Sequence, residues 1–222
     1  LSKKSKELVF VKKNMKIGVP KEIKPQENRI GLTPESVKIL TSNGHEVLVE
    51  NNGGFEAGFY NEQYKLAGAK IIDKAEDIFI DSDIIVKVKE PLSNEVKMIR
   101  ENQIVFTYLH LAAAKELTEG LIKSKSVCIA YETVTDDDGR LPLLAPMSAV
   151  AGRMSIQAGA HSLEKNQKGR GLLLGGAPGV EPANVVILGG GVVGENAALI
   201  ATGMGAKVHI VDKSEPRLKQ LQ

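Results

Sequence analysis

The sequence predicts an α/β protein in which a parallel sheet with helices on both faces is followed by the opening of a second α/β unit. Two observations lead to this fold class. From Met15 onward, short apolar runs alternate with amphipathic segments, as in successive strand–helix–strand units. Residues 185–212 (VVILGGGVVGENAALIATGMGAKVHIVD) then join two further apolar runs through a glycine-rich turn and an alanine-rich helical segment.

In the first block, the pattern places a strand at 15–20 and a helix that Thr33 caps, with Pro34 at its first position. The remaining strands are expected at 46–50, 70–72, 83–89, 104–110 and 127–132, and the remaining helices at 60–69 and 113–124. After a polar turn (DDDGR, 136–140), a helix over 148–164 and a glycine-rich connection (169–179) lead to the second unit.

The glycine-rich turn has the spacing of a dinucleotide-binding site. Gly189 allows the tight turn out of the strand, Gly191 lets the backbone approach a pyrophosphate, and Gly194 lets helix and strand pack closely. The helix that begins there presents N–H groups to the phosphates. Asp212 ends the second strand, 18 residues after Gly194, where a carboxylate accepts hydrogen bonds from a ribose. A glycine-rich turn in another fold is the alternative, but strand, helix, second strand and acid together favour a Rossmann domain.

The sequence also predicts that this Rossmann domain is truncated. Such a domain needs about six parallel strands, and only two of them precede Gln222. Leu1 in place of methionine points to a fragment as well. We therefore expect a disordered basic extension over 1–14, a substrate domain over 15–142, and an incomplete dinucleotide-binding domain over 143–222.

Charge and composition exclude several classes of function. The net charge of +2 arises in residues 1–14, which carry +4, so the rest of the chain sums to −2 and is an improbable partner for nucleic acid. No apolar run is long enough to cross a membrane. The single cysteine, Cys128, fits a reducing compartment, and the absence of histidines at metal-ligand spacing and of CxxC or HExxH motifs indicates no metal site.

Three residues of the first block are candidates for substrate chemistry because they follow strands, where parallel sheets bind ligands. Arg29 can hold a carboxylate with its two-pronged guanidinium, or it forms a surface salt bridge. Lys89 shares a face with Lys87 in an apolar strand, where an ammonium needs a partner or a cleft. His110 can exchange protons near neutral pH, or it is a hydrogen-bonded structural histidine.

Beyond these single residues, the chain from Met15 to Gln222 resembles the alanine dehydrogenase family. The segments that carry the resemblance are MKIGVPKEIKPQENRIGLTP, GHEVLVE, VKVKEP, FTYLHLA, AYETV, LPLLAPMSAVAGR, GGAPGVEPANVVILGGGVVG and GMGAKVHIVD. The resemblance implies NAD-dependent, reversible oxidative deamination of L-alanine to pyruvate and ammonium. It also implies a cytoplasmic homo-oligomer, a hexamer in that family, and a further part of the active site beyond Gln222, so that residues 1–222 alone are inactive.

The resemblance assigns roles to individual residues. Arg29 and Lys89 correspond to the residues that bind the substrate, and His110 to the catalytic acid/base. On the cofactor side, Ser148 would contact NAD, Asp212 would bind the adenosine ribose, and Arg217 would lie beside the adenosine half.

Two alternatives remain open at this point. The NAD-binding α subunit of proton-translocating transhydrogenase shares the opening PKE…R…TP pattern, but it lacks the lysine and histidine that correspond to Lys89 and His110. A non-catalytic remnant is the other alternative, because a half-formed parallel sheet exposes an unpaired edge.

Overall fold

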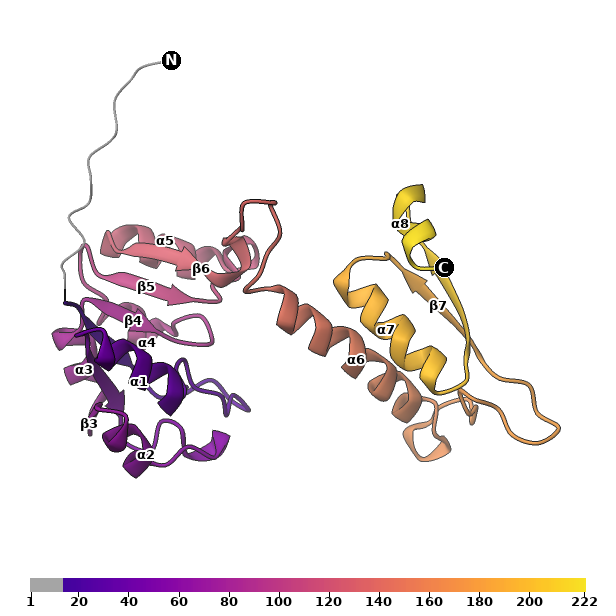
Figure 1. The fold of residues 1–222 in the computed structure, drawn as a ribbon, viewed down its shortest axis with the longest axis horizontal. Coiled ribbons are helices and arrows are strands. Elements are labelled where there is room, and N and C mark those ends of the chain that lie inside the picture. Colours follow the sequence, from indigo (N-terminus) through magenta and orange to yellow (C-terminus); the bar gives the residue numbers. More distant parts are fainter. Residues whose placement is uncertain (1–13) are drawn as a thin grey trace, which may run out of the picture. The chain divides into compact units, whose positions relative to one another are not determined.

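The computed structural model of the protein describes residues 14–222. The chain forms two compact units, the first ending at Val134 and the second running from Thr135 to Gln222 (Figure 1). This division lies a few residues before the boundary expected near residue 142. Apart from Asn14, the expected basic extension over 1–14 lies outside the described residues.

The first unit is built on a six-stranded sheet in which all neighbouring strands run parallel, in the order β3-β2-β1-β4-β5-β6. Its strands are β1 (Lys16–Val19), β2 (Glu46–Glu50), β3 (Lys70–Ile72), β4 (Ile84–Val86), β5 (Ile104–Thr107) and β6 (Val127–Ala130). Its α-helices are α1 (Pro34–Ser42), α2 (Asn61–Leu66), α3 (Ala75–Asp81), α4 (Ser93–Val96) and α5 (Lys115–Ser124). The α/β class with a parallel sheet is confirmed.

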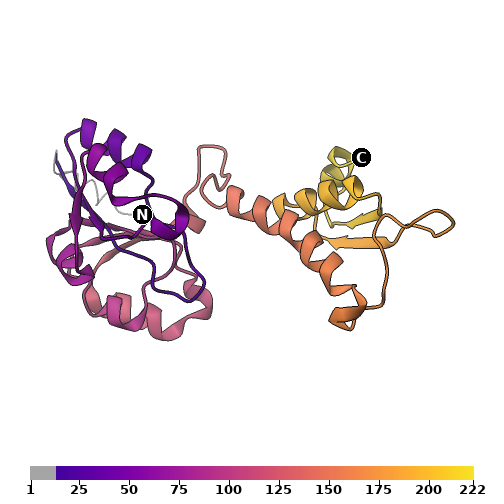
Figure 2. The same ribbon diagram turned by 90° about the horizontal axis from the view of Figure 1, so that it is seen from below.

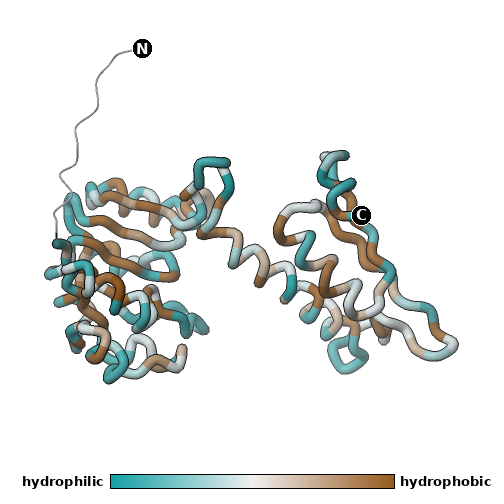
Figure 3. The backbone as a smooth tube through the Cα atoms, viewed as in Figure 1, coloured by the Kyte–Doolittle hydropathy of each residue, from teal (hydrophilic) through white to brown (hydrophobic). Residues whose placement is uncertain are grey.

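Helices cover both faces of this sheet (Figure 2). Successive strand residues point to opposite faces, and both sets are apolar and need to be buried. One buried cluster includes strand residues Ile17, Val19, Val47 and Val49 together with Val37 of α1 and Tyr64 of α2. The opposite cluster includes strand residues Leu48, Ile85 and Val105 together with Ile78 and Phe79 of α3 and Leu121 of α5. In Figure 3 the central strands are accordingly apolar along their length.

Three strands end two or more residues earlier than the sequence predicts: β4 at Val86, β5 at Thr107 and β6 at Ala130. After β4, the N–H group of Lys87 still donates to Phe106, but those of Val88 and Lys89 donate to the carboxylate of Glu22. After β5, the N–H group of Tyr108 donates to Val88, but those of Leu109 and His110 donate to the carboxylate of Glu132. From these residues onward, a side chain replaces the neighbouring backbone as hydrogen-bond acceptor. The short helices α3 and α4 were not predicted at all.

The strand order creates a switch point between β1 and β4. From β1 the chain continues outward to β2 and β3, and it returns to the other side of β1 at β4. In open parallel sheets, ligands commonly bind at the carboxyl ends of the strands at such a point. The loop after β1 carries Arg29, and the loop after β4 carries Lys89.

The second unit contains two parallel strands, β7 (Asn184–Leu188) and β8 (Lys207–Val211). Its α-helices are α6 (Ala145–Ser162), α7 (Val192–Gly203) and α8 (Glu215–Gln220). Helix α6 packs along α7, and together with the strands they bury Ile156, Ala197 and Ala201. Helix α6 begins three residues before the predicted start, because Pro146 is well tolerated in a first helical turn.

No helix within residues 14–222 is long and apolar enough to cross a membrane.

Candidate active site

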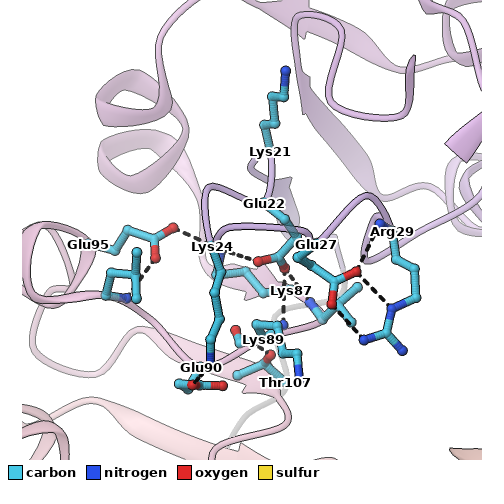
Figure 4. A network of polar contacts seen from close by, with 12 residues as sticks. Lys21, Glu22, Lys24, Glu27, Arg29, Lys87, Lys89, Glu90, Glu95 and Thr107 are labelled. Atoms are coloured by element: carbon cyan, nitrogen blue, oxygen red, sulfur yellow. Dashed lines mark hydrogen bonds and ion pairs between the residues drawn. The ribbon is translucent and has the colours of Figure 1, made fainter. Parts of the chain in front are cut away.

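The first unit gathers Arg29, Lys89 and His110 at the carboxyl end of its sheet. They lie on the loops that follow β1, β4 and β5. The pKa of Glu27, the partner of Arg29, is lowered mainly by the hydrogen bonds from Arg29, and the nearby charge of Lys89 lowers it further. Figure 4 shows the charged network around Arg29 and Lys89.

The guanidinium of Arg29 is held by the carboxylate of Glu27. The Nε atom donates to Oε1 over 2.8 Å and Nη2 donates to Oε2 over 2.6 Å. The backbone N–H of Arg29 donates to the same Oε1 over 2.9 Å. These hydrogen bonds are the largest cause that lowers the pKa of Glu27 to about 2, so this carboxylate is ionised at any physiological pH.

A buried ion cluster lies beneath Lys89. The side chain of Lys87 is 1% exposed, and its ammonium is 3.1 Å from Glu22 Oε2 and 2.8 Å from Glu95 Oε1. Each carboxylate also accepts backbone N–H groups, from Val88 and Lys89 in the case of Glu22 and from Leu92 in the case of Glu95. Lys87 therefore has the partners that a buried ammonium needs, and the cluster fixes the backbone that carries Lys89.

Further contacts fix the same segment from its other side. Thr107 Oγ1 donates to the carbonyl oxygen of Lys89 over 2.9 Å, and Tyr131 Oη donates to that of Lys87 over 3.0 Å. Lys24, on the loop after β1, forms an ion pair with Glu90. The loops after β1 and β4 are thus tied together, and Lys89 projects from a segment with little freedom to move.

His110 lies in a left-handed backbone conformation, with φ 51° and ψ 36°. Its N–H donates to Glu132 Oε1 over 2.7 Å, and the N–H of Leu109 donates to the same carboxylate. Although burial raises the pKa of Glu132, these hydrogen bonds outweigh it and leave the pKa lowered. The imidazole stacks on Tyr108, with ring centres 6.1 Å apart, and the residue is exposed. His110 is thus an exposed histidine held in a backbone conformation that is uncommon for residues other than glycine.

In the second unit, three glycines at the turn between β7 and α7 each have a different reason to be glycine. Gly189 has φ +99°, a conformation that favours glycine. A Cβ on Gly194 would lie 1.9 Å from the carbonyl oxygen of Gly189, so only glycine lets α7 approach the turn. A Cβ on Gly191 would meet no atom within 4 Å, so the backbone of this residue is open to a ligand.

Asp212 and Arg217 both bind the backbone of this turn. Asp212 accepts N–H groups from Gly190 over 2.6 Å and from Ser214 over 2.8 Å, and these two hydrogen bonds lower its pKa. The Nε atom of Arg217 donates to the carbonyl oxygen of Gly190 over 2.7 Å, and its Nη2 donates to Glu195. An ionised carboxylate and a guanidinium thus flank the end of the turn.

Ser148 lies in a groove of the second unit with a volume of about 940 Å³. The groove runs between the start of α6 and the glycine-rich turn, and its lining includes Leu144, Leu188, Gly189, Gly191 and Gly194. Its volume is within the usual range for cofactor sites. The sequence-predicted residues Ser148, Gly189, Gly191 and Gly194 therefore share one groove.

Gly194→Ala is expected to destabilise the second unit and to abolish dinucleotide binding, because the new methyl group collides with the backbone of Gly189. The destabilisation should reach roughly 1–3 kcal/mol. Gly191→Ala is the matched control: its methyl group meets open space, so folding should be retained while binding weakens. Thermal unfolding and titration with NAD measure the two effects. Equal stability of the two variants would contradict this explanation of the motif.

Sequence reasoning missed the carboxylates that organise this site, namely Glu22, Glu27, Glu95 and Glu132. Part of the signal was present, since a lysine in an apolar strand demands a partner. The sequence could not identify that partner, because Glu22 lies 65 residues before Lys87.

Comparison with known proteins identifies the family of the chain. A family model described as alanine dehydrogenase/PNT, N-terminal domain, matches residues 18–151, and its C-terminal counterpart matches residues 155–222. The chain belongs to the alanine dehydrogenase/PNT family.

Curated members of this family are close in sequence. An alanine dehydrogenase of Halomonas elongata is 55% identical over 207 residues, which cover 93% of this chain and 56% of the relative. One from Mycobacterium tuberculosis is 48% identical over the same shares of the two chains. The chain thus spans a little over half the length of these relatives.

Solved structures of the alanine dehydrogenase/PNT family show the same fold. An L-alanine dehydrogenase superposes with a TM-score of 0.86 at 54% identity, covering 93% of this chain and 57% of the other. A transhydrogenase from Sinorhizobium meliloti superposes with a TM-score of 0.77 at 25% identity, covering 93% of this chain and 61% of the other. The transhydrogenase is the more distant of these two relatives.

Proposed function

We propose that this chain belongs to an NAD-dependent alanine dehydrogenase, which oxidises L-alanine to pyruvate and ammonium in a reversible reaction and acts as a cytoplasmic homo-oligomer. The observation that carries the proposal is the placement of Arg29, Lys89 and His110 at one end of the parallel sheet. The 48–55% identity to alanine dehydrogenases supports it. The transhydrogenase alternative rests on a more distant relative and leaves Lys89 and His110 without a role.

In this proposal the first unit binds and orients the amino acid. Arg29 and Lys89 hold the substrate carboxylate and the neighbouring oxygen of the keto acid by charge-assisted hydrogen bonds. His110 accepts a proton at a ring nitrogen from the water that replaces the amine, and it returns a proton to the departing nitrogen. Holding the substrate in one orientation lowers the entropic part of the barrier.

The second unit fits NAD on the evidence of its own residues. The open backbone at Gly191, the close approach at Gly194 and the carboxylate of Asp212 suit a pyrophosphate and a ribose. Ser148 and Arg217 complete the proposed contacts, from the groove wall and beside the adenosine half, respectively. NAD bound there supplies the hydride acceptor for the substrate Cα.

The proposal is tested by assaying the purified full-length gene product for alanine-dependent formation of NADH, and for the reverse reaction with pyruvate and ammonium. Turnover with L-alanine and none with unrelated amino acids is expected. A product that binds NAD but oxidises no amino acid would instead support the transhydrogenase alternative.

Asp212→Ala is expected to relax the preference for NAD over NADP. The carboxylate of Asp212 is held at the end of the turn, where it would repel a 2′-phosphate. The ratio of kcat/KM for NAD to that for NADP should fall by about tenfold or more, which corresponds to roughly 1.4 kcal/mol. An unchanged ratio would show that Asp212 does not face the ribose.

A further inference from the structure

Glu27 and Arg29 differ sharply in how far they reach solvent. The side chain of Arg29 is 43% exposed, whereas that of Glu27 is 7% exposed. Three hydrogen bonds nevertheless join them, two from the guanidinium and one from the backbone N–H. The carboxylate of Glu27 is therefore buried while the side chain of Arg29 reaches solvent, and Figure 4 shows the hydrogen bonds that join them.

We propose that Glu27 is a positioning residue for substrate recognition, holding the plane of the Arg29 guanidinium before any ligand arrives. A free arginine side chain samples many rotamers, and binding a carboxylate would have to restrict them. Hydrogen bonds from Nε and Nη2 to Glu27 remove most of this entropic cost before binding, so the substrate meets a preorganised charge. Because Oε1 also binds the Arg29 backbone, one carboxylate fixes both ends of the side chain.

A direct role for Glu27 as a ligand of the substrate amino group fits the structure less well. Its carboxylate is nearly inaccessible, and both of its oxygens already accept hydrogen bonds from Arg29. The hydrogen bonds from Arg29, together with the charges of Arg29 and Lys89, lower its pKa to about 2 and keep it ionised. Glu27 therefore does not exchange protons during turnover and acts through Arg29.

The first test needs no catalytic activity. Phenylglyoxal modifies uncharged, accessible guanidine groups, and peptide mass spectrometry reports its rate at Arg29 in the full-length product. Pairing with Glu27 raises the pKa of Arg29 and covers one edge of the guanidinium, so Glu27→Gln should speed modification by about tenfold. Glu46→Gln is the matched control, because it breaks an exposed ion pair with Lys70 elsewhere in the same unit. An equal rate of phenylglyoxal modification at Arg29 in the two variants would overturn the proposal.

The second test rests on the proposed function. Glu27→Gln should raise KM for pyruvate and alanine by about tenfold with kcat changed less than about twofold, whereas misfolding would lower the active fraction and hence kcat. In an Arg29→Lys background, Glu27→Gln should have no further effect, since its action passes through Arg29. Additive effects would overturn the proposal. Faster modification of Arg29 in a product without alanine oxidation would refute the proposed function and leave the role of Glu27 intact.

Discussion

Replacing His110 with alanine should lower kcat for alanine oxidation by about 10²- to 10⁴-fold, the usual contribution of a positioned acid/base. The imidazole is exposed at the carboxyl end of the sheet and stacks on Tyr108, while its backbone is fixed by Glu132. The expected loss thus arises from the missing proton acceptor, because the proposed substrate-binding residues Arg29 and Lys89 are unchanged. KM for alanine should change much less than kcat. Steady-state kinetics of NADH formation measure both.

Two further variants separate chemistry from backbone strain at this position. Alanine is disfavoured at the left-handed conformation of His110, whereas asparagine tolerates it. His110→Asn should therefore fold like the parent protein and be as inactive as His110→Ala. His161→Ala removes an exposed histidine near the end of α6 and should retain full activity. If His110→Asn kept kcat within tenfold of the parent value, another group would have to exchange the proton.

Lys87→Met should lower the free energy of unfolding of the first unit by about 3–5 kcal/mol. The substitution conserves much of the side-chain volume, but it leaves Glu22 and Glu95 buried without their shared cation. All four tyrosines of residues 1–222 lie in the first unit, and these residues include no tryptophan. Tyrosine fluorescence of this chain during urea denaturation therefore reports the first unit.

The control for this experiment is Lys70→Met, which removes the lysine of an exposed pair with Glu46. Exposed ion pairs contribute about 0–1 kcal/mol, so this variant should unfold close to the parent protein. The difference in the free energy of unfolding between the Lys87→Met and Lys70→Met variants measures the effect of burying the ion pair. Equal midpoints would mean that water reaches the ammonium of Lys87 and that the cluster does not fix the segment carrying Lys89.

Local patterns predicted most of the fold correctly. The six strands and the principal helices of the first unit follow from apolar runs separated by Gly, Pro and polar residues, because these patterns report which backbone is buried. The strand–turn–helix–strand order around Gly189 was also readable, since its glycines have steric requirements that are local to the turn. The predicted strands extended beyond the observed ends of β4 and β5. There, the carboxylates of Glu22 and Glu132, which are distant in sequence, accept hydrogen bonds in place of the neighbouring strand.

The sequence by itself determined the fold class and the residues with suitable chemistry: Arg29, Lys89 and His110 in one unit and the glycine-rich turn with Asp212 in the other. Only the tertiary structure decided the strand order, and hence that the loops carrying Arg29 and Lys89 leave adjacent strands and contact each other. It also decided that Lys87 is a buried structural charge while Lys89 remains partly exposed. The physical reason is that periodicity encodes burial along one element, whereas the pairing of charges depends on contacts between elements far apart in the chain.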